Sequence, residues 1–455
     1  MSTIAAISTA PGAAGIGIIR MSGEDCFNVL KKIFVPKNDS EIKGYSIKYG
    51  NIVNSKTHEI IDEVLVSYFV APKSYTKENM CEINSHGGII VEKLILEECI
   101  KNGATLAEPG EFTKRAFLNG RIDLSQAEAI IDIINSKTEK EMEVAQRHLD
   151  GKLSEKIKEI QKLLLDVMAD IEASIDYPEY DIEETTNKKL NDVLEITKNK
   201  LEKLEQSFSI GKILKEGIKT TIIGKPNVGK SSLLKMILGE DRAIVSNIEG
   251  TTRDTIEEYI NIKGVPLKII DTAGIRNTND EIEQIGVKKS KKVIDDADLI
   301  ITVFDDSREF DDEDKEIVNL IENKNAIIII NKTDLKKGLI KNNEIIKNLK
   351  NTKIDFSTIN ENGYDELQNE ILKMFNAEEI KIDDSEIVTS QRQKENIMKA
   401  SESVNKAQKS LDDKMPLDIT AICLKDILEN LANITGENVS EDIINEIFKK
   451  FCLGK

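Results

Sequence analysis

The 455-residue sequence predicts a multidomain protein that combines an α+β domain, an all-α helical bundle and an α/β domain inserted into that bundle. Strand-type patterning fills residues 1–119, whereas a helical period fills 120–215 and returns near the C-terminus. Strands alternate with helices across 216–376. Chains of this length normally form roughly two to four domains. We therefore expect three: 1–119, 120–215 plus 377–455, and 216–376.

The N-terminal region has the pattern of a mixed domain. Helical periodicity appears at 88–101 and near 111–119, and Pro-Gly pairs mark turns. Four segments have the composition of strands: 16–20, 47–53, 64–70 and 81–84. This combination predicts an α+β domain.

Amphipathic helices are predicted on both sides of the α/β region. The first has an apolar face formed by Leu153, Ile157, Ile160, Leu164, Val167, Met168, Ile171 and Ile175. After an interruption at 176–178, the second has a face formed by Leu190, Leu194, Leu201, Leu204 and Phe208. Beyond the acidic stretch 378–386, a third has Ile397, Ala400, Val404, Ala407 and Leu411. Further helices are expected at 417–432 and, after an N-cap at Ser440, at 441–452.

These apolar faces need partners, so we expect the flanking helices to pack together as one bundle. The alternative is two independent helical regions.

A phosphate-binding loop is predicted at the start of the α/β region. The run Gly224-Lys225-Pro226-Asn227-Val228-Gly229-Lys230-Ser231-Ser232 lies between a β-branched strand and an apolar helix. Backbone N–H groups of such a loop converge on phosphates, and Lys230 adds a point charge beside them. Ser231 is placed to ligate Mg²⁺, and Gly229 permits a close approach of the backbone.

Three further stretches, in this order and spacing, predict a GTPase rather than an ATPase. The run Gly250-Thr251-Thr252-Arg253-Asp254 offers a hydroxyl to the metal. Asp271-Thr272-Ala273-Gly274 follows an apolar strand, where Asp271 can support the Mg²⁺ shell and the Gly274 amide can sense a γ-phosphate. Asn331-Lys332-Thr333-Asp334 follows another strand, and a carboxylate there can accept both guanine N–H donors.

Composition limits the possible partners and compartments. The formal charge of −18 should repel nucleic acid, so a protein acting on RNA would need a basic partner. The five cysteines form no Cys-x-x-Cys motif, which favours a reducing compartment without structural disulfides or zinc. No apolar run reaches membrane-spanning length and no targeting segment is recognisable, so we expect a soluble, cytoplasmic protein.

The residues alone leave several alternatives for the catalytic groups. Ile275 occupies the position where Ras-type enzymes have a water-orienting glutamine. The nearby acids Asp280, Glu281 and Glu283 read most simply as solvated surface groups. Asn227 and the loop 246–251 could instead enclose a K⁺ that replaces an arginine finger. The terminal Cys452-Leu453-Gly454-Lys455 is no prenylation box, which leaves a thiol nucleophile or a docked tail.

Taken together, these features resemble the MnmE (TrmE) family of tRNA-modification GTPases, which act at the wobble uridine. The resemblance extends from end to end and is most specific in the blocks 3–7, 15–23, 82–88, 108–113, 119–124 and 452–455. It implies an N-terminal domain similar to tetrahydrofolate-binding (GcvT-like) domains, which forms a homodimer. The family's folate-contacting positions correspond to Arg20, Glu82, Arg121 and Lys455, and its modification-linked cysteine to Cys452. The alternative for Arg20 and Glu82 is a surface ion pair.

The resemblance also assigns the metal ligands. It implies K⁺ at Asn227, Ser246, Ile248 and Thr251, and Mg²⁺ at Ser231 and Thr252. It makes Glu283 the water-orienting catalytic group, rather than the solvated surface acid that the residues alone suggest. With the motifs, it predicts GTP binding by Asn227, Val228, Gly229, Lys230, Ser231, Ser232, Ser246, Asn247, Ile248, Glu249, Gly250, Thr251, Thr252, Asp271, Thr272, Ala273, Gly274, Asn331, Lys332, Thr333, Asp334, Ser357, Thr358 and Ile359. Ser357-Thr358 departs from the usual Ser-Ala, which weakens the prediction for 357–359.

The family works with MnmG, an FAD-dependent flavoprotein, in a heterotetramer. Together they add an aminomethyl or carboxymethylaminomethyl group to uridine C5 of tRNA, with a carbon from methylene-tetrahydrofolate (or a 5-formyl form) and with glycine or ammonia. Which amine and which tRNAs are used stays open. The competing interpretations are a regulatory switch of the ribosome-assembly type and an N-terminal domain that only dimerises.

Overall fold

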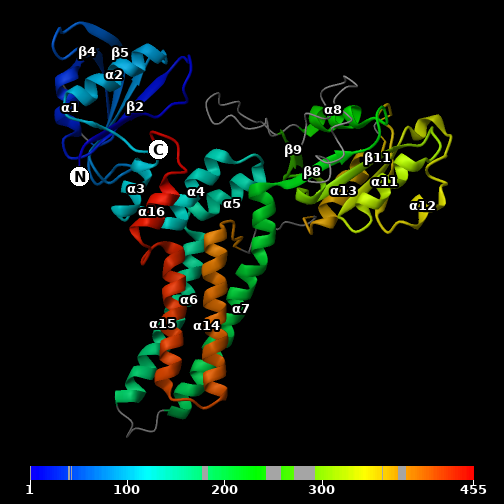
Figure 1. Ribbon diagram of the computed structural model, residues 1–455. Coiled ribbons are helices and arrows are strands. Elements are labelled where there is room, and N and C mark those ends of the chain that lie inside the picture. The colour runs from blue at the N-terminus through cyan, green and yellow to red at the C-terminus, as the bar shows by residue number, and fades with distance from the viewer. Residues whose placement is uncertain are drawn as a thin grey trace. The chain divides into compact units, whose positions relative to one another are not determined.

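The computed structural model in Figure 1 describes residues 2–38, 41–42, 44–176, 183–241, 258–270, 293–360, 362–377 and 386–455. The chain forms two compact units. One contains Met1–Ile131, His148–Leu165 and Leu424–Lys455, and the other contains Asp132–Arg147 and Asp166–Cys423. Within the described residues, no helix is long and apolar enough to cross a bilayer.

The first unit is built on a seven-stranded sheet with the order β3-β4-β5-β6-β2-β1-β7. Every pairing is antiparallel except the one between β1 and β7. The strands are β1 Ile4–Ile7, β2 Gly17–Ser22, β3 Phe34–Pro36, β4 Ser46–Val53, β5 Ile60–Phe69, β6 Met80–Ser85 and β7 Thr105–Leu106. The helices of this region are α1 Cys26–Ile33, α2 Ile89–Lys101 and α3 Glu111–Leu118.

The α+β prediction is therefore confirmed for this region. The four predicted strands and both predicted helices are present within a few residues of their expected bounds. The sequence patterns did not single out α1 or the short strands at the sheet edges. Apolar residues of α1 and α2 pack with β2, β5 and β6 in one core, which includes Leu30, Ile95, Ile19, Val66 and Ile83.

The C-terminal segment packs against α3 within the same unit. Phe448 and Phe451 join Ala116 and Leu124 in a small core, and their two rings lie 5.2 Å apart between centroids. The helix α16 (Glu441–Phe448) is shorter than the predicted 441–452. The reason is tertiary: residues after Phe448 leave the helix, and the Gly110 amide donates to the Cys452 carbonyl at 3.3 Å.

The remaining helices are α4 Leu124–Asn135, α5 Glu139–Leu149, α6 Lys152–Asp176, α7 Glu183–Glu216, α14 Gln391–Asp412 and α15 Leu417–Thr435. The predicted apolar faces of α6, α7 and α14 are largely buried. Helices α7 and α14, from opposite sides of the α/β region, run side by side (Figure 1). The Val388 amide donates to Ser207 Oγ at 3.0 Å, and Lys394 Nζ lies 4.6 Å from the centroid of the Phe208 ring. A single bundle requires contact of this kind between α7 and α14. The domain boundaries stay a prediction.

The α/β region contains a six-stranded sheet with the order β13-β12-β11-β8-β10-β9, parallel except for the β9–β10 hairpin. Its strands are β8 Ile218–Ile223, β9 Glu258–Ile262, β10 Val265–Ile269, β11 Leu299–Asp305, β12 Ala326–Asn331 and β13 Thr352–Asp355. Its helices are α8 Lys230–Asp241, α11 Asp312–Ile321, α12 Glu344–Asn348 and α13 Tyr364–Met374, with a 3₁₀ turn at Thr333–Leu335. Two cores, one containing α8 and α13 and the other α11 and α12, cover the two faces. Ligands of such sheets bind at the carboxyl ends of the strands.

Candidate nucleotide and folate sites

The predicted phosphate-binding loop joins β8 to α8 in a backbone conformation that depends on glycine. Gly224 and Gly229 have φ angles of 150° and 109°, and Asn227 is left-handed with φ 61°. A Cβ on Gly229 would lie 2.1 Å from Asn331 Nδ2. Because glycine alone tolerates both the φ angle and this approach, the loop can lie close to Asn331 at the end of β12.

Lys230 folds back over the loop that precedes it. Its Nζ donates to the carbonyl oxygens of Gly224 and Lys225 at 2.7 and 2.8 Å. Lys230 is also the first residue of α8, so the unpaired N–H groups of that helix open toward the same point. Positive charge and N–H donors at a helix N-terminus form a site suited to a phosphate chain.

The second motif meets the loop from the end of β12. Asn331 Nδ2 donates to the Val228 carbonyl at 2.8 Å, and Asn331 Oδ1 is buried with no hydrogen-bond partner among the described residues. Lys332 Nζ donates to the Asn227 carbonyl at 3.0 Å and to Asp305 Oδ2 at 2.6 Å. The two motifs, predicted separately, are therefore brought into direct contact.

Asp305 is a site residue that the sequence interpretation missed. Burial acts to raise the pKa of its carboxyl, but hydrogen bonds from Lys332 and Ser307 outweigh burial and hold the pKa below its ordinary value. The charged Asp305 thus fixes the Lys332 ammonium. Its position as the last residue of β11 is the signal that could have identified it, because the carboxyl ends of β8, β11 and β12 are neighbours.

Residues predicted to bind guanine are also in contact with one another. Ser357 Oγ donates to Asp334 Oδ1 at 2.8 Å, and the Thr333 hydroxyl donates to the Phe356 carbonyl at 2.9 Å. Ser357 is buried, whereas Ile359 is 79% exposed. The Ser-Thr departure noted in the sequence therefore leaves the contact that orients Asp334 intact.

Twelve of the predicted site residues lie outside the described part of the chain. These are Ser246, Asn247, Ile248, Glu249, Gly250, Thr251, Thr252, Asp271, Thr272, Ala273, Gly274 and Glu283. The predicted catalytic glutamate and most of the predicted K⁺ ligands are among them.

The predicted folate residues gather where the C-terminal tail meets the N-terminal sheet. Arg20 on β2 pairs with Glu82, its register partner on β6, with 2.8 Å between Nη2 and Oε1. Arg20 Nη1 also donates to the Gly454 carbonyl at 3.1 Å. Burial and the Arg20 guanidinium lower the pKa of Lys455, although Glu82 acts in the opposite direction.

Aromatic rings complete this cluster. The guanidinium carbons of Arg20 and Arg121 lie 5.5 and 4.6 Å from the centroid of the Tyr75 ring. Arg20 also lies 5.6 Å from the centroid of the Phe112 ring. The structure thus brings three of the four predicted residues into contact or close proximity and links Arg121 to them through Tyr75. No sequence pattern had pointed to Tyr75. Cys452 is exposed in the same tail.

The comparisons with known proteins agree with this organisation. The family model for the GTP-binding protein TrmE N-terminus matches residues 3–121, and that for the MnmE helical domain matches 124–452. The chain belongs to the MnmE (TrmE) family of tRNA-modification GTPases. A relative from Acetivibrio thermocellus, named tRNA modification GTPase MnmE, is 51% identical over 457 residues, covering 100% of this chain and 99% of the relative.

Two more relatives with the same name come from Alkaliphilus oremlandii and Clostridioides difficile. They are 50% and 49% identical, and each alignment covers 100% of this chain and 99% of the relative. This chain is therefore a tRNA-modification GTPase of the MnmE family, while the roles of the loop at 224–232 and of the motif at 331–334 stay predictions.

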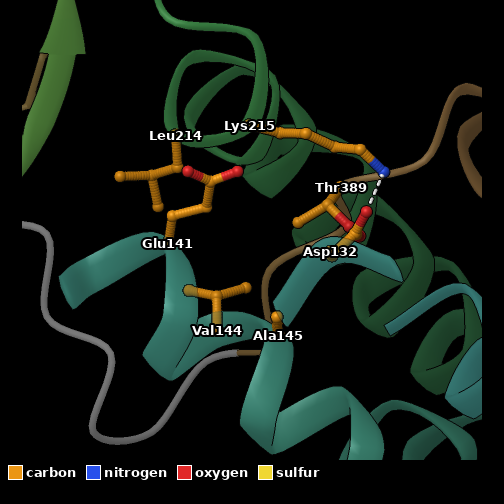
Figure 2. Close-up of a pocket in the computed structure, with 7 residues that line it drawn as sticks. All are labelled: Asp132, Glu141, Val144, Ala145, Leu214, Lys215 and Thr389. Carbon is orange, nitrogen blue, oxygen red and sulfur yellow. Dashed lines mark ion pairs between the residues drawn. The ribbon is translucent and has the colours of Figure 1, made fainter. Parts of the chain in front are cut away.

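A small, mostly apolar pocket lies near the junction of α7 and β8. Figure 2 shows the residues that line it: Asp132, Glu141, Val144, Ala145, Leu214, Lys215 and Thr389. Burial raises the pKa of Glu141 to about 7, although the Lys137 amide, which donates to Glu141 Oε2 at 2.7 Å, opposes this. The Lys215 ammonium pairs instead with Asp132 at 2.7 Å.

Proposed function

We propose that this protein is the GTP-hydrolysing component of a complex that modifies the wobble uridine of tRNA at C5. One observation carries the proposal: the phosphate-binding loop and the Asn331–Asp334 motif meet through the Asn331–Val228 and Lys332–Asn227 hydrogen bonds. In this proposal, the loop binds the triphosphate and the Asn331–Asp334 motif binds guanine, so their contact supports one nucleotide site. The relatives, named for tRNA modification over their full length, favour this role over a ribosome-assembly switch.

Nucleotide specificity tests the proposal directly. A carboxylate at Asp334 accepts the N1–H and N2–H of guanine, whereas an amide can donate to the O2 of xanthine. Asp334→Asn should lower GTP affinity by about 100-fold and raise xanthosine triphosphate affinity, measured by fluorescent-nucleotide displacement. Equal affinity of both proteins for both nucleotides would contradict a guanine site.

For the metals, we propose Mg²⁺ at Ser231 and Thr252 and K⁺ at Asn227, Ser246, Ile248 and Thr251, with Glu283 orienting water. One of these residues, Asn227, lies in the phosphate-binding loop with a left-handed φ of 61°, which is compatible with its proposed role. GTPase rates in K⁺ and Na⁺ at matched ionic strength, for wild type and Glu283→Ala, test it. We expect K⁺-specific activation that the mutant lacks, and equal rates in both salts would rule out the K⁺ site.

At the tail, we propose that Arg20, Glu82, Arg121 and Lys455 bind 5-formyl- or methylene-tetrahydrofolate in a GcvT-like domain. The donor set suits such a ligand: cations match glutamate and carbonyl oxygens, Glu82 can accept pterin N–H groups, and Tyr75 offers a ring face. We expect 5-formyl-tetrahydrofolate to bind wild type in calorimetry and to bind Arg121→Ala about 10-fold more weakly. Undetectable binding to wild type would leave the domain as a dimerisation platform.

We further propose a cytoplasmic homodimer that joins an MnmG-type, FAD-dependent partner in a heterotetramer. The charge of −18 supports this, because a chain this acidic needs a basic partner to hold tRNA. Light scattering of the protein with and without such a partner would measure the assembly. A monomer that binds tRNA tightly alone would contradict it.

A further inference from the structure

A lysine in the phosphate-binding loop is held by two acids that the nucleotide motifs do not include. Lys225 Nζ lies 2.6 Å from Asp311 Oδ2 and 2.9 Å from Asp314 Oδ2. The side chains of Lys225 and Asp314 are 9% and 5% exposed. The Asp311 side chain is 56% exposed, so the buried pair is Lys225–Asp314. Such a pair is costly to break, since removing one partner leaves the other charge uncompensated.

The two acids are themselves fixed in place by the start of α11. Asp311 Oδ1 accepts from the amides of Glu313 and Asp314 at 3.0 and 3.2 Å, and Asp314 Oδ2 accepts from the Asp311 amide at 3.2 Å. This reciprocal capping box orients both carboxylates through contacts that do not involve Lys225. The helix is anchored to the sheet by Val318 and Ile321, which lie in the core of that face.

The same lysine also contacts the phosphate-site lysine. The Lys225 carbonyl accepts from Lys230 Nζ at 2.8 Å, so one residue is joined to α11 by its side chain and to Lys230 by its backbone. Burial acts to lower the pKa of Lys225, but the hydrogen bonds that Lys225 donates to Asp311 and Asp314 outweigh it and raise the pKa. Lys225 is therefore charged, and its single positive charge is shared between the two carboxylates.

We propose that Lys225 is a positioning residue for GTP hydrolysis. Its ion pairs with Asp311 and Asp314 hold the phosphate-binding loop, and through the loop Lys230, in a fixed position relative to α11. Lys225 touches no phosphate in this role. It acts by fixing the loop on a rigid helix, which preorganises the N–H donors that stabilise the transferred phosphoryl group. This inference rests on the GTP hydrolysis proposed above.

The test is a kinetic comparison of Lys225→Met, which removes the charge, with Lys225→Arg, which keeps it. We expect Lys225→Met to lower kcat at saturating GTP and K⁺ by about 10-fold and Lys225→Arg to restore most of it. Lys235→Met, on the exposed face of α8, is the matched control and should leave the rate unchanged. A lysine that serves stability alone would lower the melting temperature and leave kcat at wild-type values, which would overturn the proposal.

A double-mutant cycle locates the effect in the ion pair. If Lys225 acts through Asp314, Lys225→Met combined with Asp314→Asn should lose no more activity than the stronger single variant. Fully additive losses would show that the two residues act separately and would contradict the proposal. Should Lys225→Met fail to fold, Asp311→Asn provides the same test from the more exposed partner, with an expected decrease in kcat of about 3-fold.

These outcomes are separable from failure of the proposed function. A wild-type protein without GTPase activity would overturn both. Normal wild-type turnover with unchanged kcat in Lys225→Met and Asp311→Asn would overturn this inference only.

Discussion

The side-chain amide of Asn331 donates a hydrogen bond to the main-chain oxygen of Val228 across 103 positions of sequence. The bond ties the end of β12 to the phosphate-binding loop, and it explains why the loop needs glycine at the next position. The bond therefore links the predicted guanine side of the site to the predicted phosphate side.

Removing this amide should weaken nucleotide binding. Asn331→Ala deletes the donor and leaves the buried Val228 carbonyl without it, which costs about 1–3 kcal/mol. We expect a roughly 10- to 100-fold loss in GDP affinity, measured by fluorescent-nucleotide titration. Asn319→Ala on the exposed side of α11 is the control, and an equal effect from both variants would contradict the role of Asn331.

Gly229→Ala should abolish nucleotide binding while the fold survives. The φ of 109° disfavours any side chain, and the new Cβ would lie 2.1 Å from Asn331 Nδ2. Gly239→Ala, within the helix α8 that follows the loop, has open space around it and should stabilise the protein by about 0.5–1 kcal/mol. Thermal melts and GDP titrations of both variants check this, and normal GDP binding by Gly229→Ala would show that the loop adapts.

Gly454→Ala should displace the C-terminal tail from the folate cluster. Its φ is 86°, and an added Cβ would lie 2.4 Å from the Ile7 carbonyl, so the bonds from Ser8 and Arg20 to the Gly454 carbonyl should weaken. We expect 5-formyl-tetrahydrofolate affinity to fall by about 10-fold while the GTPase rate is unchanged. Leu453→Ala, at an exposed side chain, is the control. Equal folate affinity in Gly454→Ala and wild type would show that the position of the tail does not affect folate binding.

Glu141 makes stability depend on pH near neutrality. Because burial raises its pKa to about 7 in the folded protein, above the value of about 4.5 in an unfolded chain, the folded state binds its proton more tightly. Stability is therefore lost as pH rises from about 4.5 through 7, by at most roughly 3 kcal/mol. The charges that act on it are those of Lys137, Asp132 and Lys215, and Asp132 and Lys215 line the pocket together with Glu141 (Figure 2).

Glu141→Gln should remove this dependence, because its amide stays neutral and can still accept from the Lys137 amide. We expect the variant to melt higher than wild type at pH 8.5 and at a similar temperature at pH 5. Glu143→Gln, on the exposed face of α5, should track wild type at both values. A constant difference between Glu141→Gln and wild type across this range would show that Glu141 is ionised throughout.

Features that depend on local spacing were predictable from the sequence. The alternation of 47–53 and the 3.6-residue stripe of Leu190, Leu194 and Leu201 each identify an element, because side-chain direction follows directly from backbone geometry. The run from Gly224 to Ser232 likewise identifies its chemistry, because its glycines and its lysine are required by the phosphate itself. The predicted roles of Glu283 and Ser246, which lie outside the described residues, rest on the sequence alone and stay predictions.

The tertiary structure decided which distant groups meet. Nothing local indicates that Lys225 pairs with Asp311 and Asp314, or that Asp305 fixes Lys332, because each pair forms only when β8, β11 and β12 lie side by side. The end of α16 at Phe448 was misplaced for a related reason: the helical pattern continues, but the tail gains the Gly110–Cys452 and Arg20–Gly454 hydrogen bonds by leaving the helix. The sequence by itself determined which functional groups the chain carries, because motif spacing is local. The packing of distant segments determined which of those groups come into contact.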